Sequence, residues 1–253
     1  MLSVHDVAVA YPNGVIALEP TSARFERGKF IVLLGASGAG KSTLLRTLNG
    51  LIRPTLGDVH VEGRGSIFAS RRTLRAHRRA TGMVFQQHHL IGRLTALENV
   101  LTGRLAAHGT LRSMLPLPRA DRVIALEALE RVGLAERALD RADQLSGGQQ
   151  QRVGIARAMA QKPEIILADE PVASLDPATA TKVLADLHRI CREDGITAIV
   201  SLHQVDLARQ YADHIIGLAQ GRIVFGGAPG ELRSAVLEQL YNASRPALAE
   251  AAE

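Results

Sequence analysis

Two glycine-rich segments hold the residues of this chain that are best suited to chemistry. Residues 35–42 read GASGAGKS and complete the G-x-x-x-x-G-K-S pattern of a phosphate-binding loop. Residues 145–149 read LSGGQ, a short polar segment just before an apolar-periodic run that begins near Gln150. Each segment can present backbone N–H groups at the start of a helix, where an anion is stabilised. A single nucleotide needs only one such turn, so the second predicts a nucleotide held from two sides.

Each residue type in the first segment has a part in holding phosphate. Gly35, Gly38 and Gly40 allow the backbone to curl so that successive N–H groups point at phosphate oxygens. The ammonium of Lys41 is a compact charge suited to the β- and γ-phosphates, and the hydroxyl of Ser42 can reach Mg²⁺. In the second segment the serine can cap the following helix, and the two glycines permit close backbone approach to an anion.

Four polar residues follow apolar runs that we expect to be strands. Asp169 and Glu170 end one run, where the aspartate can hold Mg²⁺ and the glutamate can polarise the attacking water. Such a pair usually caps a helix, but beside a phosphate-binding loop the functional interpretation is favoured. Gln86 can ligate Mg²⁺ and position water, although an ordinary surface glutamine also explains it. His203 ends a strand at the same edge and can contact a γ-phosphate, the alternative being a structural histidine.

Hydrophobic periodicity predicts the elements that must position these residues. Strands are expected at 2–9 and 17–25, joined by a turn at 11–14, and at 30–34, 58–62, 83–85, 165–169, 196–202, 215–218 and 223–225. Helices are expected after Gln149 and at 41–49, 121–132, 177–192 (with Asp176 as N-cap), 205–211 and 231–242. Alternating strands and helices predict an α/β fold with a parallel core, and the stretch from 94 through the helix after Gln149 is expected to be a helical insertion.

Bulk composition limits the class of protein. The 253 residues are 46% hydrophobic, which is enough for the core of one large domain. The single cysteine, Cys191, excludes an intrachain disulfide and fits a reducing compartment. The first residues lack the features of a signal peptide, and no window reaches the ~20 apolar residues of a membrane helix. We therefore expect a protein that is soluble or peripheral to a membrane.

Much of the excess positive charge of the chain lies in one segment. The formal net charge is +5, and five arginines lie close together in the sequence: Arg71, Arg72, Arg75, Arg78 and Arg79. A nucleic-acid patch is one interpretation, but a solvated helix face or a surface near anionic lipid headgroups is favoured. Aromatic content is 3% and Trp is absent, which argues against a platform for stacking single strands.

The motifs together resemble those of ATP-binding-cassette (ABC) ATPases. The phosphate-binding loop, Gln86, LSGGQ, Asp169-Glu170, the segment 174–176 and His203 occur in the order of that family, over nearly the whole chain. The resemblance implies a P-loop NTPase core with a mixed sheet, an N-terminal antiparallel β subdomain and a helical subdomain insertion that carries LSGGQ. It also implies one ATPase domain at 1–243, with core and β subdomain at about 1–92 and 162–243, helical subdomain at about 93–161, and a flexible tail at 244–253.

The resemblance further implies how nucleotide is held. Two copies form a head-to-tail homodimer with two MgATP, and Lys41 of one copy and Ser146 of the other clasp the same ATP. Tyr11 is expected to stack on adenine, and Asp176 to communicate across the dimer. The other expected nucleotide contacts are Gly35, Ala36, Ser37, Gly38, Ala39, Gly40, Ser42, Thr43, Gly147, Gly148 and Gln149.

Catalytic and metal roles follow from the same resemblance. Glu170 is expected to be the catalytic base, with His203 and Gln86 beside the γ-phosphate. Mg²⁺ is expected at Ser42, Gln86 and Asp169.

The flanking sequence is similar to that of the phosphonate-importer subgroup. The segments that carry this likeness are 85–94, 98–105, 142–152, 168–177 and 201–208. It implies an ATP-hydrolysing energy-coupling subunit, peripheral at the cytoplasmic face of the bacterial inner membrane. Its partners are a polytopic permease and, indirectly, a periplasmic substrate-binding protein, so no residue here is expected to touch the phosphonate. Ala36 replaces a frequent Pro and keeps its N–H, and the aromatics common near 114–117, expected near the permease contact, are absent.

Other functions remain open at this point. The substrate can be phosphate or phosphite, and the chain can serve another import system or carbon–phosphorus lyase machinery. A nucleic-acid-associated or ribosome-associated ABC ATPase is a rival because of the arginine cluster. Such proteins usually have tandem cassettes or a long coiled coil, which this chain lacks, so no nucleic-acid partner is expected. A small-molecule kinase leaves LSGGQ unexplained.

Overall fold

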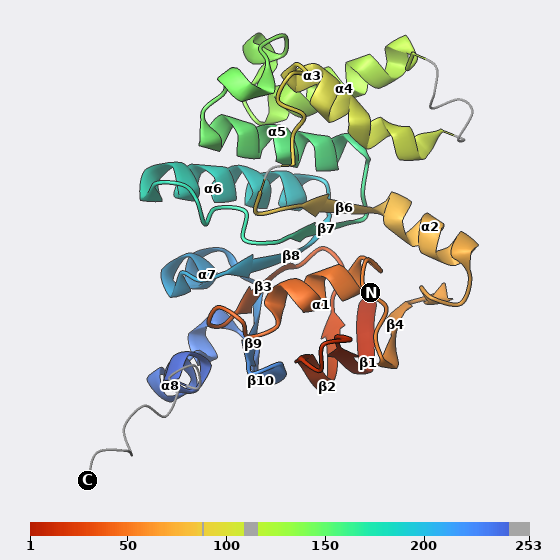
Figure 1. Cartoon of the computed structure of the whole chain (residues 1–253). Helices are drawn as coiled ribbons and strands as arrows, with labels where there is room; N and C mark the ends of the chain where they lie inside the picture. Colours follow the sequence, from red (N-terminus) through yellow and green to blue (C-terminus); the bar gives the residue numbers. More distant parts are fainter. Residues whose placement is uncertain (88, 109–115, 243–253) are drawn as a thin grey trace.

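The structure, a computed structural model, describes residues 1–87, 89–108 and 116–242 (Figure 1). The expected tail at 244–253 and the first half of the segment 114–117 lie outside these residues. No helix among the described residues combines the length and the apolarity of a bilayer-spanning segment.

A mixed six-stranded sheet forms the centre of the fold, with the strand order β10, β9, β3, β8, β7, β6. Its strands are β3 (Phe30–Leu34), β6 (Thr81–Val84), β7 (Ile165–Ala168), β8 (Thr197–Leu202), β9 (His214–Ala219) and β10 (Arg222–Gly227). All neighbours are parallel except β10, which pairs with β9 in an antiparallel hairpin. Gln220 and Gly221 form the turn with φ of 49° and 76°, the left-handed geometry that suits a tight hairpin.

A second, antiparallel sheet is built from the N-terminal part of the chain, with the order β2, β1, β4, β5. Its strands are β1 (Leu2–Ala10), β2 (Ile16–Phe25), β4 (Leu56–Val61) and β5 (Gly65–Ser66). The predicted hairpin, the mixed central sheet and the α/β class are thus confirmed.

The helices lie in layers on either side of the central sheet (Figure 1). They are α1 (Lys41–Leu48), α2 (Arg71–Ala80), α3 (Ala96–Leu101), α4 (Arg119–Arg131), α5 (Gly147–Ala160), α6 (Pro177–Glu193), α7 (Val205–Tyr211) and α8 (Ser234–Asn242). Short 3-10 turns occur at Thr102–Ala107, Ala135–Arg137, Ala142–Gln144 and Pro229–Glu231. The last of these occupies the start of the helix expected at 231–242, so α8 begins only at Ser234.

Alternate residues of the central strands face opposite sides of the sheet, and this separates two apolar clusters. Phe30, Val32 and Leu34 pack in a cluster with residues of α4, α5 and α6, whereas Ile31 and Leu33 pack with α1 and the antiparallel sheet. A strand buried on both faces needs such a continuous apolar run. α1 and α5 therefore cover opposite faces of the same sheet.

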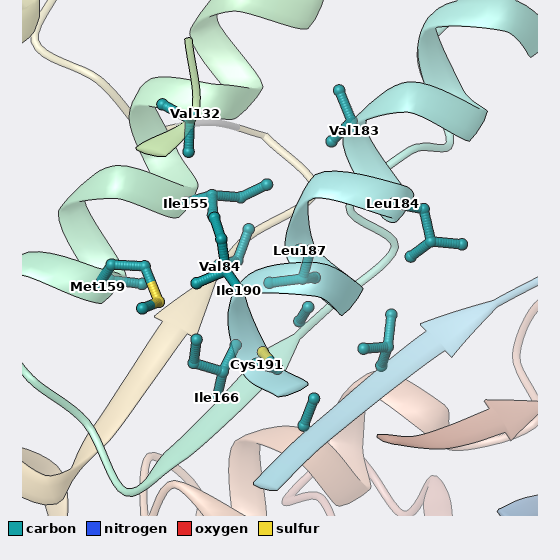
Figure 2. Close-up of a cluster of buried hydrophobic side chains, with 14 of the residues drawn as sticks. Val84, Val132, Ile155, Met159, Ile166, Val183, Leu184, Leu187, Ile190 and Cys191 are labelled. Carbon is teal, nitrogen blue, oxygen red and sulfur yellow. The ribbon is translucent and has the colours of Figure 1, made fainter. Parts of the chain in front are cut away.

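The cluster under α5 and α6 fixes the position of the helix that was expected after Gln149; it begins earlier, at Gly147 within LSGGQ. In Figure 2, Ile155 and Met159 of α5 lie near Leu187 and Ile190 of α6, with Ile166 of β7 below them. The free thiol of Cys191 is buried in the same cluster. The second half of α5 is thus held by the core.

The arginine-rich segment forms α2, which periodicity did not predict. Ser70 and Thr73 make a reciprocal capping box at its start. Only His77 is fully buried on this helix, and its Nε2 lies 2.7 Å from the carbonyl oxygen of Leu48 at the end of α1. With one buried residue and five exposed arginines, α2 shows no apolar stripe that a pattern search would find.

We expect the buried imidazole of His77 to make the protein sensitive to acid. Burial is the largest effect and lowers the pKa of His77, while the contact with Leu48 opposes it. The unfolded chain therefore takes up a proton near pH 6.5 before the folded chain does, so stability is full above about pH 6.5 and falls as the pH drops below it. Urea unfolding of His77→Gln should show a shallower loss of stability between about pH 6.5 and 5 than the wild type. His60→Gln, at a partly exposed histidine, is the control and should retain the wild-type slope.

Candidate active site

The phosphate-binding loop leaves β3 and enters α1 with little room for side chains. Gly40 is the N-cap of α1 with φ of 102°, and a Cβ there would lie 2.7 Å from the carbonyl oxygen of Ala17. A Cβ at Gly35 would lie 2.2 Å from the carbonyl oxygen of Leu218. Only glycine fits at both places, and the resulting curl ends at an uncapped helix N-terminus, where an anion is favoured.

Lys41 is buried and folds back over this loop. Its Nζ donates hydrogen bonds to the carbonyl oxygens of Gly35 at 2.7 Å and Ala36 at 2.9 Å. Burial lowers the pKa of Lys41, and the carboxylates of Glu170 and Asp169 act in the opposite direction. The ammonium is therefore fixed inside the loop with two acidic groups close by.

Asp169 brings β7 into contact with α1. Ser42 Oγ donates to Asp169 Oδ1 at 2.7 Å, and the guanidinium of Arg46 lies 3.8 Å from Oδ2. A hydroxyl and a carboxylate side by side are the hard oxygen donors that Mg²⁺ prefers. No cluster of three or more His, Cys, Asp or Glu side chains suited to a metal occurs in the described part of the chain. This donor set fits Mg²⁺, which usually takes one or two protein ligands and completes its shell with water and phosphate.

Glu170 and His203 meet directly. His203 Nε2 lies 2.5 Å from Glu170 Oε1, and the same oxygen is 4.0 Å from Lys41 Nζ. The hydroxyl of Tyr241 in α8 donates to the carbonyl oxygen of His203 at 2.9 Å, which fixes the backbone there. A carboxylate held between an imidazole and an ammonium is placed to accept a proton.

Two predicted residues lie at the margin of this group. Gln86 follows β6 and is exposed, and none of the described contacts joins it to Ser42 or Asp169. Tyr11 is partly buried, with its hydroxyl 3.4 Å from Thr43 Oγ1. Their predicted roles in metal binding and adenine stacking therefore stay predictions.

The LSGGQ turn begins α5 as an exposed cap. Ser146 Oγ accepts from the N–H of Gln149, and the side chain of Gln149 accepts from the N–H of Ser146. Leu145 anchors the turn in the core, while Ser146 and Gly147 are exposed. A Cβ at Gly148 would lie 2.4 Å from Thr179 Cγ2, so this glycine lets α5 approach α6.

Asp176 caps α6 beside that turn, as the sequence predicted. Its carboxylate accepts from the N–H of Thr179 at 3.0 Å. The hydrogen bonds from Thr179 are the largest effect and lower the pKa of Asp176, which keeps this exposed group ionised. Because Thr179 also touches Gly148, Asp176 and the LSGGQ turn form one surface.

The structure thus divides the predicted site residues into two groups. Lys41, Ser42, Asp169, Glu170 and His203 come together at the edge of the sheet where the parallel strands end. The LSGGQ turn belongs to the helix layer on the other face, and no hydrogen bond or ion pair between described residues joins it to the loop 35–42.

Two residues near the acidic pair were not among the predicted ones. Ser201 is fully buried in β8 and contacts both Asp169 and the backbone of Glu170. Arg46 lies one turn along α1 from Ser42. A signal for Ser201 exists in the sequence, because a hydroxyl within the apolar run TAIVSL needs a hydrogen-bond partner.

Comparison with known families gives the same family as the one that the motifs resemble. A profile described as "ABC transporter" matches residues 18–173. A phosphonates import ATP-binding protein of Nostoc sp. is 60% identical over 241 residues, which cover 95% of this chain and 92% of the relative. A phosphite import ATP-binding protein of Stutzerimonas stutzeri is 63% identical over 245 residues, covering 95% and 87%.

Solved structures give the same result for the fold. One is a dimeric ATP-binding cassette in a post-hydrolysis state, bound to ADP and Pi. It is 36% identical and covers 90% of this chain and 99% of its own, with a TM-score of 0.79. A second, the ADP conformation of a cassette of an ABC transporter, is 25% identical with a TM-score of 0.82, and covers 94% and 95%.

Proposed function

The chain belongs to the ABC transporter family, and we propose that it is the ATP-hydrolysing subunit of an importer for phosphonates or the related phosphite. Support for the substrate class comes from the two import ATP-binding proteins that are 60% and 63% identical to it. Because these two relatives carry different substrate names at similar identity, phosphonate and phosphite are kept together as one class of small phosphorus oxyanions.

The observation that carries this function is the position of the two glycine-rich turns. Lys41, Ser42, Asp169, Glu170 and His203 make half of a nucleotide site, whereas the LSGGQ turn is exposed on the far helix layer. A head-to-tail pair of chains brings the turn of one copy onto the loop of the other. Such a twofold arrangement makes two identical sites, each shared between both copies.

Within each shared site the residues have separate tasks. Lys41 and the N–H groups of the loop hold phosphate oxygens, and Ser146 of the second copy closes over the nucleotide. Ser42 and Asp169 would hold Mg²⁺, with Gln86 completing the set; the ion neutralises phosphate charge when bound. Glu170 takes the proton of the attacking water, and His203 holds the Glu170 carboxylate in place.

Closure of the dimer is proposed to do the mechanical work. The region 93–161 acts as the helical subdomain and is carried by α5, whose start lies at the shared site. Binding of ATP draws this region towards the second copy, and hydrolysis releases it. The force is delivered to a polytopic permease at the cytoplasmic face of the membrane, and a periplasmic protein presents the substrate on the other side. In this proposal the nucleotide-binding core and the β subdomain are made by residues at about 1–92 and 162–243.

Loss of the lysine ammonium should weaken nucleotide binding itself. Lys41→Ala removes the buried positive charge and the bonds that fold it over the loop, so we expect ATP affinity to fall at least tenfold. Fluorescence titration with a labelled ATP analogue measures this. Lys29→Ala is the matched control: this exposed lysine lies just before β3, and the variant should bind like the wild type.

Transport assays test the function as a whole. The chain is reconstituted in proteoliposomes with the permease encoded beside its gene. ATP hydrolysis is then followed with the binding protein loaded with methylphosphonate, phosphite or phosphate. We expect the first two ligands to stimulate hydrolysis. Stimulation by phosphate alone would reassign the substrate, and a chain that never co-purifies with a permease would remove the importer assignment.

A further inference from the structure

Ser201 is a buried hydroxyl that touches both acidic residues of the candidate site. It lies in β8 with 0% of its surface exposed. Its Oγ accepts a hydrogen bond from the N–H of Glu170 at 2.8 Å and donates one to Asp169 Oδ1 at 3.1 Å. The same Asp169 oxygen accepts from Ser42 Oγ at 2.7 Å. Ser201 therefore uses its one proton on the first carboxylate and a lone pair on the backbone of the second residue.

The backbone at Glu170 explains why this bond matters. The N–H of Asp169 still donates to the carbonyl oxygen of Val84 on β6, as it would in a continuing sheet. At Glu170 the chain turns into the left-handed region, with φ of 47°. A residue other than glycine is strained in this region, and it keeps this backbone conformation only where the surrounding structure holds it. The Ser201 hydroxyl supplies the acceptor for the N–H at this turn.

The direction of the Glu170 side chain depends on the same turn. Its carboxylate must reach His203 and stay within 4.0 Å of Lys41 Nζ. If the N–H of Glu170 lost its acceptor, the turn could relax towards the extended backbone and carry the carboxylate away. Asp169 would lose one of the two hydroxyl donors on Oδ1 at the same time.

We propose that Ser201 is a positioning residue, which aims the carboxylates of Asp169 and Glu170 for ATP hydrolysis without touching the nucleotide. The proposal rests on the function given above, because it assumes that these two carboxylates act on water and Mg²⁺. Alanine has neither the donor nor the acceptor that the position uses, whereas threonine keeps both.

Thr197 offers a matched control in the same strand. It lies four residues earlier, so its side chain is on the same face of β8. Thr197 is 5% exposed, and its Oγ1 accepts from the N–H of Gly28 at 3.0 Å. Thr197→Ala and Ser201→Ala therefore each remove a buried hydroxyl that accepts a backbone N–H, but only Ser201 is at the acidic pair.

The experiment compares Ser201→Ala, Ser201→Thr and Thr197→Ala with the wild type. We expect kcat to fall about 10- to 100-fold in Ser201→Ala, the usual effect of losing a group that orients a metal or catalytic carboxylate. The KM for ATP should change little, because Lys41 and the loop stay intact. Ser201→Thr should restore most of kcat, and Thr197→Ala should have the kcat of the wild type. Both alanine variants should have a lower Tm than the wild type.

Hydrogen exchange gives a readout that needs no turnover. The amide of Glu170 should be protected in the wild type and should exchange faster in Ser201→Ala, but not in Thr197→Ala. An unprotected Glu170 amide in the wild type, or wild-type kcat in Ser201→Ala, would overturn the proposal, as would equal losses of kcat in both alanine variants. If the wild type hydrolyses no ATP, the proposed function fails instead, and the exchange result still decides what Ser201 does to the backbone.

Discussion

Glu170→Gln is expected to bind ATP, to accumulate as a closed dimer and to lose nearly all turnover. Glutamine has the shape of glutamate but cannot accept a proton from water. Removing a general base typically lowers the rate about 10²- to 10⁴-fold, and we expect kcat to fall in that range. The loop 35–42, Lys41 and the LSGGQ turn are untouched, so the contacts that close the dimer remain.

Charge acts in the same direction as the loss of the base. In the wild type the Glu170 carboxylate lies beside His203 and 4.0 Å from Lys41 Nζ, where it adds negative charge close to the place of the phosphates. A neutral amide relieves that repulsion, because like charges at short range destabilise each other. ATP should therefore be held longer by the variant than by the wild type.

Light scattering coupled to gel filtration in MgATP measures the dimer, and phosphate release measures turnover. Glu164→Gln is the matched control. Glu164 lies just before β7, the strand that leads to Glu170; it is half-exposed and pairs with Arg64. That variant should hydrolyse ATP like the wild type and should not accumulate as a dimer. Normal hydrolysis by Glu170→Gln would remove its assignment as the base, and a variant that stays monomeric in saturating MgATP would contradict the shared site.

The sequence was a good guide wherever one residue type has one physical reason to be present. The loop 35–42 follows β3 and starts α1 as predicted, because the glycines and the apolar strand leave one arrangement. Asp176 is the N-cap of α6, with Pro177 behind it. Both assignments rest on local chemistry that needs no knowledge of the rest of the fold.

Local sequence patterns did not predict features that depend on strand pairing or that consist mainly of polar residues. α2 has a single buried side chain, so its helix is stabilised by the Ser70 capping box and by His77 rather than by an apolar stripe. Ser201 gains its meaning only when β8 is paired with β7, which sets its hydroxyl against Asp169. Pairing between strands 32 residues apart in the sequence cannot be read from a local pattern.

The placement of the two glycine-rich turns leads to the sharpest test of the shared site. Ser146→Arg puts a long charged side chain on the exposed start of α5, and should block closure while each chain still binds nucleotide. Because Ser146 also caps α5, its replacement by a residue that cannot cap, such as arginine or alanine, costs about 1 kcal/mol of stability. Ser146→Ala removes the cap without bulk, so it separates that loss from a block of the interface.

Mixing two defective variants then distinguishes a site shared between chains from a site within one chain. A head-to-tail dimer of Lys41→Ala with Ser146→Arg has one site with both defects and one site with neither, since each site takes its loop and its turn from different copies. We expect the mixture to retain ATP through gel filtration, although neither variant alone does so. Both chains carry Glu170→Gln as well, so that retention after gel filtration is measured without turnover. Lys41→Ala mixed with the Lys41→Ala, Ser146→Arg double variant offers no whole site in any pairing and should retain none. A mixture in which the mixed dimer forms but retains no more ATP than either variant alone would show that Lys41 and Ser146 do not serve the same nucleotide from opposite chains.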